Sequence, residues 1–268
     1  MASKQHIYLS PHFGDAVLSC GGQIAQRRQA GKTVIVATVF GGEPRVEHLS
    51  PLARKRRDRS GAGRNLPAQG RAEEIQALAI LDAEARPGGY LNGIYRQDQD
   101  RTRWLYTSEE ALHGPLDPAD EPLVAELAQV FAALAPEPGR CVIYAPLGVG
   151  NHVDHQLVHR AARSLHEHGY RVRFYEDFPS VLEGAGSLQT TLAGTTLRWQ
   201  PKAIALSKRS LRLKAEAIRC YAGQVAALAP VADGSQLDSL LEAIDSYARQ
   251  AGRETGGTHA ERVWRLRP

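Results

Sequence analysis

The sequence lacks a long hydrophobic run. Its longest strongly apolar segment, residues 34–40, is far shorter than the roughly 20 residues that a membrane-spanning helix needs. The N-terminus also lacks the apolar stretch that signal peptides carry. We therefore expect no membrane span and a cytoplasmic location.

Cysteine is scarce as well. The chain has three cysteines, Cys20, Cys141 and Cys220, which are far apart and form no CxxC pair. An odd number at such spacing argues against a disulfide framework and against a zinc cluster held by thiolates. We expect the three side chains to be buried thiols.

Two familiar functional motifs are incomplete. The GVG at residues 148–150 lacks the third glycine of a dinucleotide-binding fingerprint, so a nicotinamide cofactor is not expected. His155 and His159 are four residues apart, but the stretch reads HQLVH and lacks the glutamate of HExxH. We therefore expect His159 on the surface of its helix.

Strong charge of one sign is also missing. The formal net charge is +4, and the one dense basic run, residues 53–59, has no aromatic side chains between its arginines. We expect this run to be a solvated, mobile loop. Two alternatives stay open, a loop that gathers an anionic or sugar-like substrate and a nucleic-acid patch, but we expect no nucleic-acid partner.

The remaining composition is that of an ordinary globular protein, with 268 residues, 43% hydrophobic and 23% charged. Apolar runs predict strands at residues 6–10, 33–40, 141–145 and 172–176. Helical spacing predicts helices at residues 15–30, 71–82, 122–134 and 154–168. This alternation predicts an α/β fold with a Rossmann-like, mainly parallel sheet and helices on both faces.

The chain is expected to form a single domain over residues 1–268. Residues 1–180 would be its Rossmann-like core. Residues 181–268 would form a C-terminal helical lobe packed on that core, with helices at 207–227 and 236–249 and a final strand at 263–266. No repeat or low-complexity linker separates the two parts.

Two loops carry residues suited to chemistry. SPHFGD at residues 10–15 follows the first predicted strand, and NHVDH at residues 151–155 follows the strand at 141–145. Ligands of parallel sheets bind at the carboxyl ends of strands, so His12, Asp15 and one histidine of the second loop could form an open zinc site. These residues could also have purely structural roles: the two aspartates as helix caps, and the histidines as surface side chains.

In this arrangement the chain resembles the PIG-L/LmbE-like family of metal-dependent de-N-acetylases, which remove acetyl groups from N-acetylglucosamine-type sugars. The family's first motif, (A/S)PHxDD, matches residues 10–15 at all but one position, and its HxDH motif matches residues 152–155. Residues 71–74 (RAEE) resemble the family's RxxE helix, and residues 89–96 resemble a segment that usually carries Asp at Asn92. A weaker similarity continues through residues 175–179 and 214–224.

The resemblance implies a role for each motif residue. His12, Asp15 and His155 would bind the metal, which would be zinc or another divalent ion. His152 would stabilise the oxyanion or protonate the leaving amine, and Asp154 would orient or tune it. The fold implied is the same parallel α/β sheet.

Arg71 and Asn92 would face the sugar by the same resemblance. The family's general base is the first Asp of the DD pair, and this position is Gly14. Loss of a general base typically slows a reaction about 10²–10⁴-fold. Activity is therefore reduced or absent, unless another carboxylate such as Asp154, or a group of the substrate, supplies the base.

The sequence thus predicts a zinc-dependent hydrolase that removes the N-acetyl group from an N-acetylglucosamine-type sugar conjugate through a metal-bound water. The alternative is a non-catalytic sugar- or metal-binding pseudoenzyme. The expected partner is the amino-sugar conjugate, and a homo-oligomer stays open.

Overall fold

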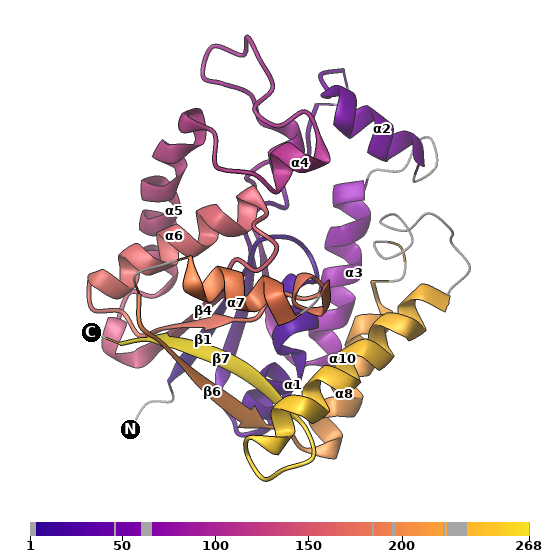
Figure 1. The fold of residues 1–268 in the computed structure, drawn as a ribbon, viewed down its shortest axis with the longest axis vertical. Coiled ribbons are helices and arrows are strands. Elements are labelled where there is room, and N and C mark those ends of the chain that lie inside the picture. The colour runs from indigo at the N-terminus through magenta and orange to yellow at the C-terminus, as the bar shows by residue number, and fades with distance from the viewer. Residues whose placement is uncertain are drawn as a thin grey trace.

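A seven-stranded sheet runs through the molecule (Figure 1). The computed structural model describes residues 4–45, 47–59, 66–183, 185–194, 197–221, 223 and 235–267. The strand order is β3-β2-β1-β4-β5-β7-β6. The strands are β1 (Gln5–Ser10), β2 (Thr33–Thr38), β3 (Glu84–Pro87), β4 (Cys141–Pro146), β5 (Val172–Tyr175), β6 (Trp199–Ala205) and β7 (Ala260–Leu266). The first five are parallel, and β7 is antiparallel to both β5 and β6.

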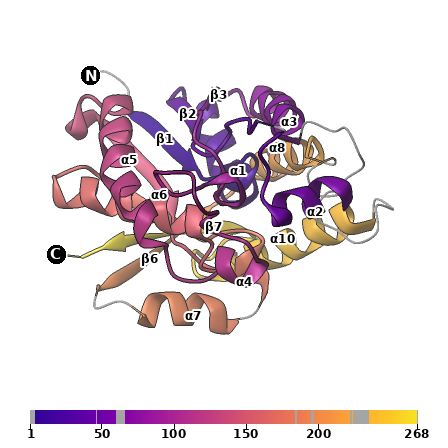
Figure 2. The same ribbon diagram turned by 90° about the horizontal axis from the view of Figure 1, so that it is seen from above.

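Helices cover both faces of the sheet, as Figure 2 shows from above. They are α1 (Asp15–Gln29), α2 (Pro51–Arg59), α3 (Leu66–Ile80), α4 (Glu109–Leu112), α5 (Glu121–Leu134), α6 (Val153–Glu167), α7 (Ala185–Ala193), α8 (Lys208–Arg219) and α10 (Ser235–Arg253). Short 3-10 turns lie at Gly93–Tyr95, Pro118–Asp120, Pro138–Arg140 and Ser180–Glu183. Helices α1, α3 and α10 each contact α8, while α5 packs on α6, which contacts β4 and β5.

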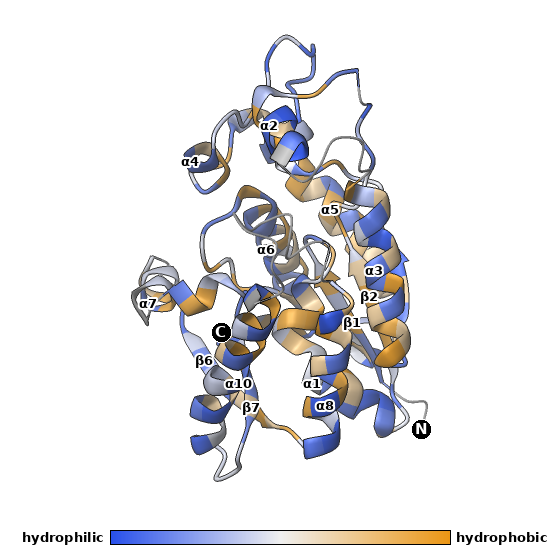
Figure 3. Ribbon diagram, turned by 90° about the vertical axis from the view of Figure 1, so that its right-hand side faces the viewer, coloured by the Kyte–Doolittle hydropathy of each residue, from blue (hydrophilic) through white to orange (hydrophobic). Residues whose placement is uncertain are grey.

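The central strands explain why the sheet is stable. Strand β4 is buried along its whole length, and β2 is buried in all but its first residue. Strands of this kind are apolar on both sides because helices cover both faces. The hydropathy colouring of Figure 3 shows the contrast, with hydrophilic residues over much of the peripheral α2.

The connections change direction between β1 and β4. The chain leaves β1 toward β2 and β3, and returns to place β4 and β5 on the other side of β1. Such a switch point creates a crevice at the carboxyl ends of the two neighbouring strands. Both loops singled out in the sequence, after β1 and after β4, meet there.

The predicted fold class is confirmed: the sheet is mainly parallel and the alternation of strands and helices is as expected. Two strands were not anticipated, β3 and β6, and they are the two edges of the sheet. The final predicted strand is β7, while residues 222 and 224–227 of the helix predicted at 207–227 lie outside the described residues.

Three smaller expectations are wrong. The basic run is not a loop but helix α2, because Ser50 caps its first turn and Pro51 starts it. His159 is half-buried, with Nδ1 3.1 Å from the Pro146 carbonyl and its ring against Phe174. Cys220 is half-buried, whereas the other two cysteines are buried as expected.

The C-terminal segment is built into the same sheet. Strand β7 pairs with β5, and α8 packs against α1. The ammonium of Lys214 donates to Glu261 Oε1 at 2.8 Å, and both side chains are buried between these elements. Among the described helices, none is long and apolar enough to cross a membrane.

Candidate metal centre

Three neighbouring strands deliver the candidate site. His12 and Asp15 lie in the turn from β1 to α1, and His152 and His155 lie where β4 is followed by α6. Asp177 follows β5. Because β1, β4 and β5 are adjacent and parallel, their carboxyl ends meet at one edge of the sheet.

Two histidines and one carboxylate converge on a single point. Asp15 Oδ2 lies 3.3 Å from His12 Nδ1 and 3.2 Å from His155 Nε2. All three donor atoms lie within 4.8 Å of one another. Ligands about 2.0–2.1 Å from a tetrahedral zinc ion are about 3.3 Å apart, so the spacing suits such a metal.

The second nitrogen of each histidine is held by a buried carboxylate. His12 Nε2 lies 2.7 Å from Asp154 Oδ2, and His155 Nδ1 lies 2.6 Å from Asp177 Oδ1. A carboxylate in this place keeps the proton on the nitrogen that faces it. His12 Nδ1 and His155 Nε2 are therefore the nitrogens that would bind a metal beside Asp15, with release of any second ring proton.

Opposite charges within this cluster shift the pKa values of its members. Burial alone would lower the pKa of His155, but the carboxylates of Asp15 and Asp177 outweigh it and raise that pKa to about 10. Burial would raise the pKa of Asp15, but His155 and His12 hold it well below its usual range. The carboxylate of Asp15 is therefore ionised across the physiological range, as a metal ligand must be.

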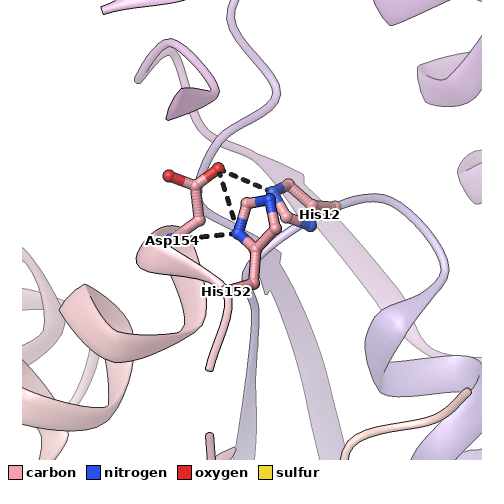
Figure 4. Close-up of side chains that lie close together, drawn as sticks. All are labelled: His12, His152 and Asp154. Atoms are coloured by element: carbon pink, nitrogen blue, oxygen red, sulfur yellow. Dashed lines mark hydrogen bonds and ion pairs between the residues drawn. The ribbon is translucent and has the colours of Figure 1, made fainter. Parts of the chain in front are cut away.

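A second group of possible ligands overlaps the first. His12, His152 and Asp154 also bring donor atoms within 4.8 Å (Figure 4). However, Asp154 Oδ1 pairs with Arg96, and its Oδ2 accepts from Gly93 N and pairs with His12. A metal at Asp154 would compete with these contacts, so the group of His12, Asp15 and His155 fits a metal better.

His152 has the features of a neutral hydrogen-bond donor. The Asp154 backbone N–H donates to His152 Nδ1 at 3.1 Å, which assigns the ring proton to Nε2. Burial keeps the pKa of His152 well below its ordinary value. Its ring lies edge-on to His12, with 4.9 Å between ring centroids.

Asp154 contacts His12 more closely than it contacts His152. The distance from Asp154 Oδ2 to His152 Nδ1 is 4.0 Å, against 2.7 Å to His12 Nε2. Its influence on His152 runs mainly through the backbone N–H. The nearby Arg96 holds the Asp154 pKa well below its usual range against the opposing effect of burial.

Gly14 occupies a backbone conformation that favours glycine, with φ +93°. Its N–H donates to Glu74 Oε2 at 2.8 Å. A Cβ added at Gly14 would lie 3.5 Å from the ring of Tyr221, which is an ordinary contact. The hydroxyl of Tyr221 also donates to Glu74, so a buried pair lies beside the position at which a general base was expected.

The two residues expected to face the sugar have other contacts. Arg71 Nη2 donates to the Gly41 carbonyl at 3.0 Å. Asn92 Oδ1 accepts from Ile94 N at 3.1 Å and caps the short helix at Gly93–Tyr95. Asn92 precedes Gly93, whose N–H reaches Asp154, so this segment adjoins the site.

Sequence reasoning missed several members of the site. Asp177 lies within the stretch YEDFP at residues 175–179, and Glu74 lies in RAEE, but neither had been given a role. Arg96 bridges Asp154 and Asp120; it ends the segment 89–96 noted for Asn92, but it was given no role there. The signal available for Asp177 was its place directly after a buried strand.

A family model described as "PIG-L: GlcNAc-PI de-N-acetylase" matches residues 7–166. A 2'-N-acetylparomamine deacetylase of Niallia circulans is 28% identical over 202 residues, which cover 66% of this chain and 67% of the relative. A deacetylase of the same name from Streptomyces fradiae is 33% identical over 177 residues, which cover 65% of this chain and 56% of the relative. The match thus spans little more than half of the second relative.

Solved structures agree in fold. The crystal structure of a zinc-inhibited form of teicoplanin deacetylase has a TM-score of 0.81 and is 27% identical, with 98% of both chains covered. This similarity extends through the C-terminal segment that the family model does not reach. Since the family model matches more than half of the chain, the protein belongs to the PIG-L family of de-N-acetylases, which are hydrolases of amide bonds.

Proposed function

We propose that this protein removes the N-acetyl group from an N-acetylglucosamine-type sugar conjugate in a zinc-dependent reaction. The convergence of His12, Asp15 and His155 carries the proposal, because the other nitrogen of each histidine is oriented by a buried carboxylate. The names of the relatives support the substrate class, since they are deacetylases of acetylparomamine and teicoplanin.

His12, Asp15 and His155 would hold the metal, with zinc favoured by the N/N/O donor set. When bound, the ion would polarise the amide carbonyl and lower the pKa of water. Asp154 and Asp177 keep the two histidines in the tautomer and orientation that ligation needs. The His12–Asp154 and His155–Asp177 pairs are already formed, so these side chains need little reorganisation to bind a metal.

His152 would stabilise the charge that develops on the amide oxygen. Its Nε2–H is a donor at neutral pH, because the ring is neutral and Nδ1 is occupied by the Asp154 N–H. A preoriented donor in a site shielded from water typically contributes about 10²–10³-fold to the rate. Arg71 and Asn92 would contact the sugar at the rim, where both side chains are half-buried.

The missing base is expected to limit the rate. Asp154 is a poor replacement, because it is fully buried and Arg96, Gly93 N and His12 occupy its oxygens. Glu74 is buried as well, and its oxygens accept from Gly14 N, Tyr221 and Thr38. We therefore propose a slow hydrolase whose rate an acid at position 14 would raise.

The experiment is acetate release from N-acetylglucosamine and simple conjugates by the zinc-loaded protein and by Gly14→Asp. We expect the variant to be faster by about 10²–10⁴-fold, which is the usual effect of a general base. The positive φ at this position costs a non-glycine residue about 1–3 kcal/mol, so the variant should also be less stable.

Gly14→Asn is the matched control, because it bears the same backbone strain without a carboxylate. It should be destabilised like Gly14→Asp but gain no activity. If both variants and the parent release acetate equally fast, the base lies elsewhere.

A non-catalytic sugar- or metal-binding protein is the second candidate, and the loss of the acid at Gly14 favours it. This reading predicts zinc binding through His12, Asp15 and His155 without turnover in either the parent or Gly14→Asp. Zinc binding that persists in the His12→Ala, Asp15→Ala and His155→Ala variants would contradict both candidates.

A further inference from the structure

A second hollow lies at the amino ends of β1, β4 and β5, opposite the strand ends that carry the metal centre. Its volume is about 550 Å³, and helix α1 and the antiparallel strands β6 and β7 complete its walls. In Figure 1, β6, β7 and the N-terminal end lie on the same side of the molecule. Small-molecule sites commonly have volumes of about 300–1,000 Å³.

Positive charge dominates the lining of this hollow, which we call the basic groove. Among the residues that the structure describes, no aspartate or glutamate lines it. Its lysines and arginines are Lys4, Arg27, Arg171, Arg173, Lys202 and Arg265. They come from α1 and from four separate parts of the sheet, so the fold gathers these charges from distant parts of the sequence.

Like charges face each other across the floor of the basic groove. Strand β5 pairs with β7 so that Phe174 is opposite Trp264, and the same register places Arg173 opposite Arg265. Burial lowers the pKa of Arg173, and the neighbouring charges of Arg265 and Arg171 lower it further. Like charges directly opposite destabilise a strand pair, so this arrangement works against folding.

Within the described part of the chain, no carboxylate forms an ion pair with any lysine or arginine of the basic groove. The Nε atom of Arg265 is buried and has no hydrogen-bond partner there. Arg262 lies on the same strand and shows the contrast, because it pairs with both Glu176 and Glu254. An unpaired buried donor is costly unless a ligand satisfies it.

The side of the basic groove near α1 is held in place. Arg27 Nη2 donates to the Tyr144 hydroxyl at 2.7 Å, and its Nη1 donates to the Gln23 carbonyl at 3.1 Å. Burial and the positive charges of Arg27, Lys32 and Lys4 lower the pKa of His6 to about 4. This side is therefore a preorganised wall with a positive field.

We propose that the basic groove binds a small polyanion, a molecule that carries two or more phosphate groups. Guanidinium groups suit this ligand because their planar donors match phosphate oxygens, and Arg173 and Arg265 lie together on the floor. Because several lysines and arginines of the basic groove lack a carboxylate partner among the described residues, a ligand with several negative charges would bind best. Binding would relieve the repulsion between the two arginines.

A small molecule fits better than a nucleic acid. Binding of single strands usually relies on aromatic rings on which bases stack. Of the described lining residues, only Tyr144 has an aromatic carbocycle. Its ring is stacked on Tyr8 at 4.3 Å and has Arg27 at 4.9 Å from its centroid. The net charge of +4 is also modest for a chain that binds nucleic acid non-specifically.

Calorimetric titration with inorganic tripolyphosphate at fixed ionic strength tests the proposal. We expect saturable binding to the full-length protein, with a Kd that Arg265→Gln and Lys202→Gln each raise about tenfold or more. Lys202 is exposed, so its replacement should not disturb folding. Arg212→Gln is the charge-matched control on the exposed side of α8, and it should leave the Kd unchanged.

Two further readouts separate a binding site from a general charge effect. Without tripolyphosphate, Arg265→Gln should unfold at an equal or higher urea concentration than the parent, because it removes repulsion. Acetate release should be the same in Arg265→Gln and the parent, because the groove and metal centre lie at opposite strand ends.

Three outcomes would overturn the proposal. Tripolyphosphate could fail to bind saturably, or it could bind Arg265→Gln and Lys202→Gln with the same Kd as the parent. A single-stranded oligonucleotide with the same number of phosphates could also bind more tightly than tripolyphosphate. A self-associated protein whose dissociation follows Arg265→Gln would assign this face to a second copy of the chain.

Discussion

At the scale of single residues, Asp177 connects the candidate metal centre to the loop after β4. Its Oδ1 faces His155 Nδ1, while its Oδ2 accepts from Gly148 N and Val149 N. One carboxylate thus holds both the loop after β4 and the ring of His155, a candidate metal ligand on α6. The side chain is 1% exposed, so water cannot replace it readily.

Asp177→Asn should weaken zinc binding about 10–100-fold, as replacements of such orienting carboxylates typically do. The amide oxygen can keep the bonds from Gly148 N and Val149 N, which leaves the amide NH₂ facing His155. That donor favours a lone pair on Nδ1 and a proton on Nε2, the nitrogen meant for the metal. Competition with a chromogenic chelator measures the affinity.

Asp58→Asn is the charge-matched control for this experiment, because Asp58 is exposed on α2. It should bind zinc as the parent does. An Asp177→Asn protein with the parent's zinc affinity would show that Asp177 does not orient His155.

Glu74 presents a different case, a buried carboxylate in a hydrogen-bonded pocket. Burial raises its pKa to about 7, although the bonds from Tyr221, Gly14 N and Thr38 oppose this shift. Below the unfolded-state value of 4.5 the group is protonated in both states. As the pH rises through 4.5 to about 7, the unfolded state loses its proton first, so the folded state loses stability.

Glu74→Gln should remove this pH dependence. Its oxygen can accept from Gly14 N and Tyr221, and its NH₂ can donate to Thr38. The free energy of unfolding of the variant minus that of the parent should rise by about 3 kcal/mol between about pH 4.5 and about pH 8. Urea unfolding in the presence of a chelator measures it.

Glu137→Gln, at an exposed glutamate, controls for the change of charge. A difference between Glu74→Gln and the parent that stays constant with pH would contradict the raised pKa of Glu74.

The sequence could identify His12, Asp15, His152 and His155 as a candidate site, because they lie in two short motifs after strands. It could not assign the carboxylate that holds each histidine. Asp154 was expected to orient or tune His152. Its carboxylate instead lies closer to the ring of His12, which is 142 residues away in the chain. Such pairings depend on the order of the strands in the sheet, which the spacing within a motif does not reveal.

At the scale of elements, two adjacent glycines let α1 approach the C-terminal segment. A Cβ at Gly22 would lie 2.6 Å from Leu206 Cδ1 and 2.9 Å from Glu261 Oε1. Glu261 in turn accepts from the backbone N–H groups of Gly22 and Gln23. The carboxylate of β7 therefore docks directly on the backbone of α1.

Gly22→Ala should lower the free energy of unfolding by about 1–3 kcal/mol, because overpacking displaces Leu206 and Glu261. The gain in helix propensity from glycine to alanine, up to about 1 kcal/mol, acts in the opposite direction. Gly139→Ala is the control, since its added Cβ would meet nothing within 4 Å. Urea unfolding compares them, and a Gly22→Ala protein as stable as the parent would refute the close packing.

Elements with a strong pattern were predicted well, and those without one were missed. The buried strands β1, β2 and β4 have continuous apolar runs. Strands β3 and β6 lie at the sheet edges, are largely exposed and contain Pro87 and Pro201, so they lack an apolar signal. Helix α2 was missed because its charges outweighed the Ser50–Pro51 start signal.

At the scale of the whole molecule, the two parts expected from the sequence share one sheet and one core. Strand β7 lies between β5 and β6, so the C-terminal segment continues the sheet of the first part. Tyr221 is buried against the site and bonds to Glu74 of α3. Loss of either part would expose core residues of the other, so we propose that the chain unfolds as one unit.

Tryptophan fluorescence can test this, because Trp104 lies in the first part, and the other two, Trp199 and Trp264, lie in the second. In Trp104→Phe, both remaining tryptophans lie in the C-terminal segment and contact the first part, while far-ultraviolet circular dichroism reports on the whole chain. For one cooperative unit the two urea transitions should coincide. Because α8 packs on α1 and β7 pairs with β5, the C-terminal segment cannot separate without exposing these elements. A fluorescence midpoint clearly below that of circular dichroism would mean that residues 181–268 unfold first, as a separate lobe.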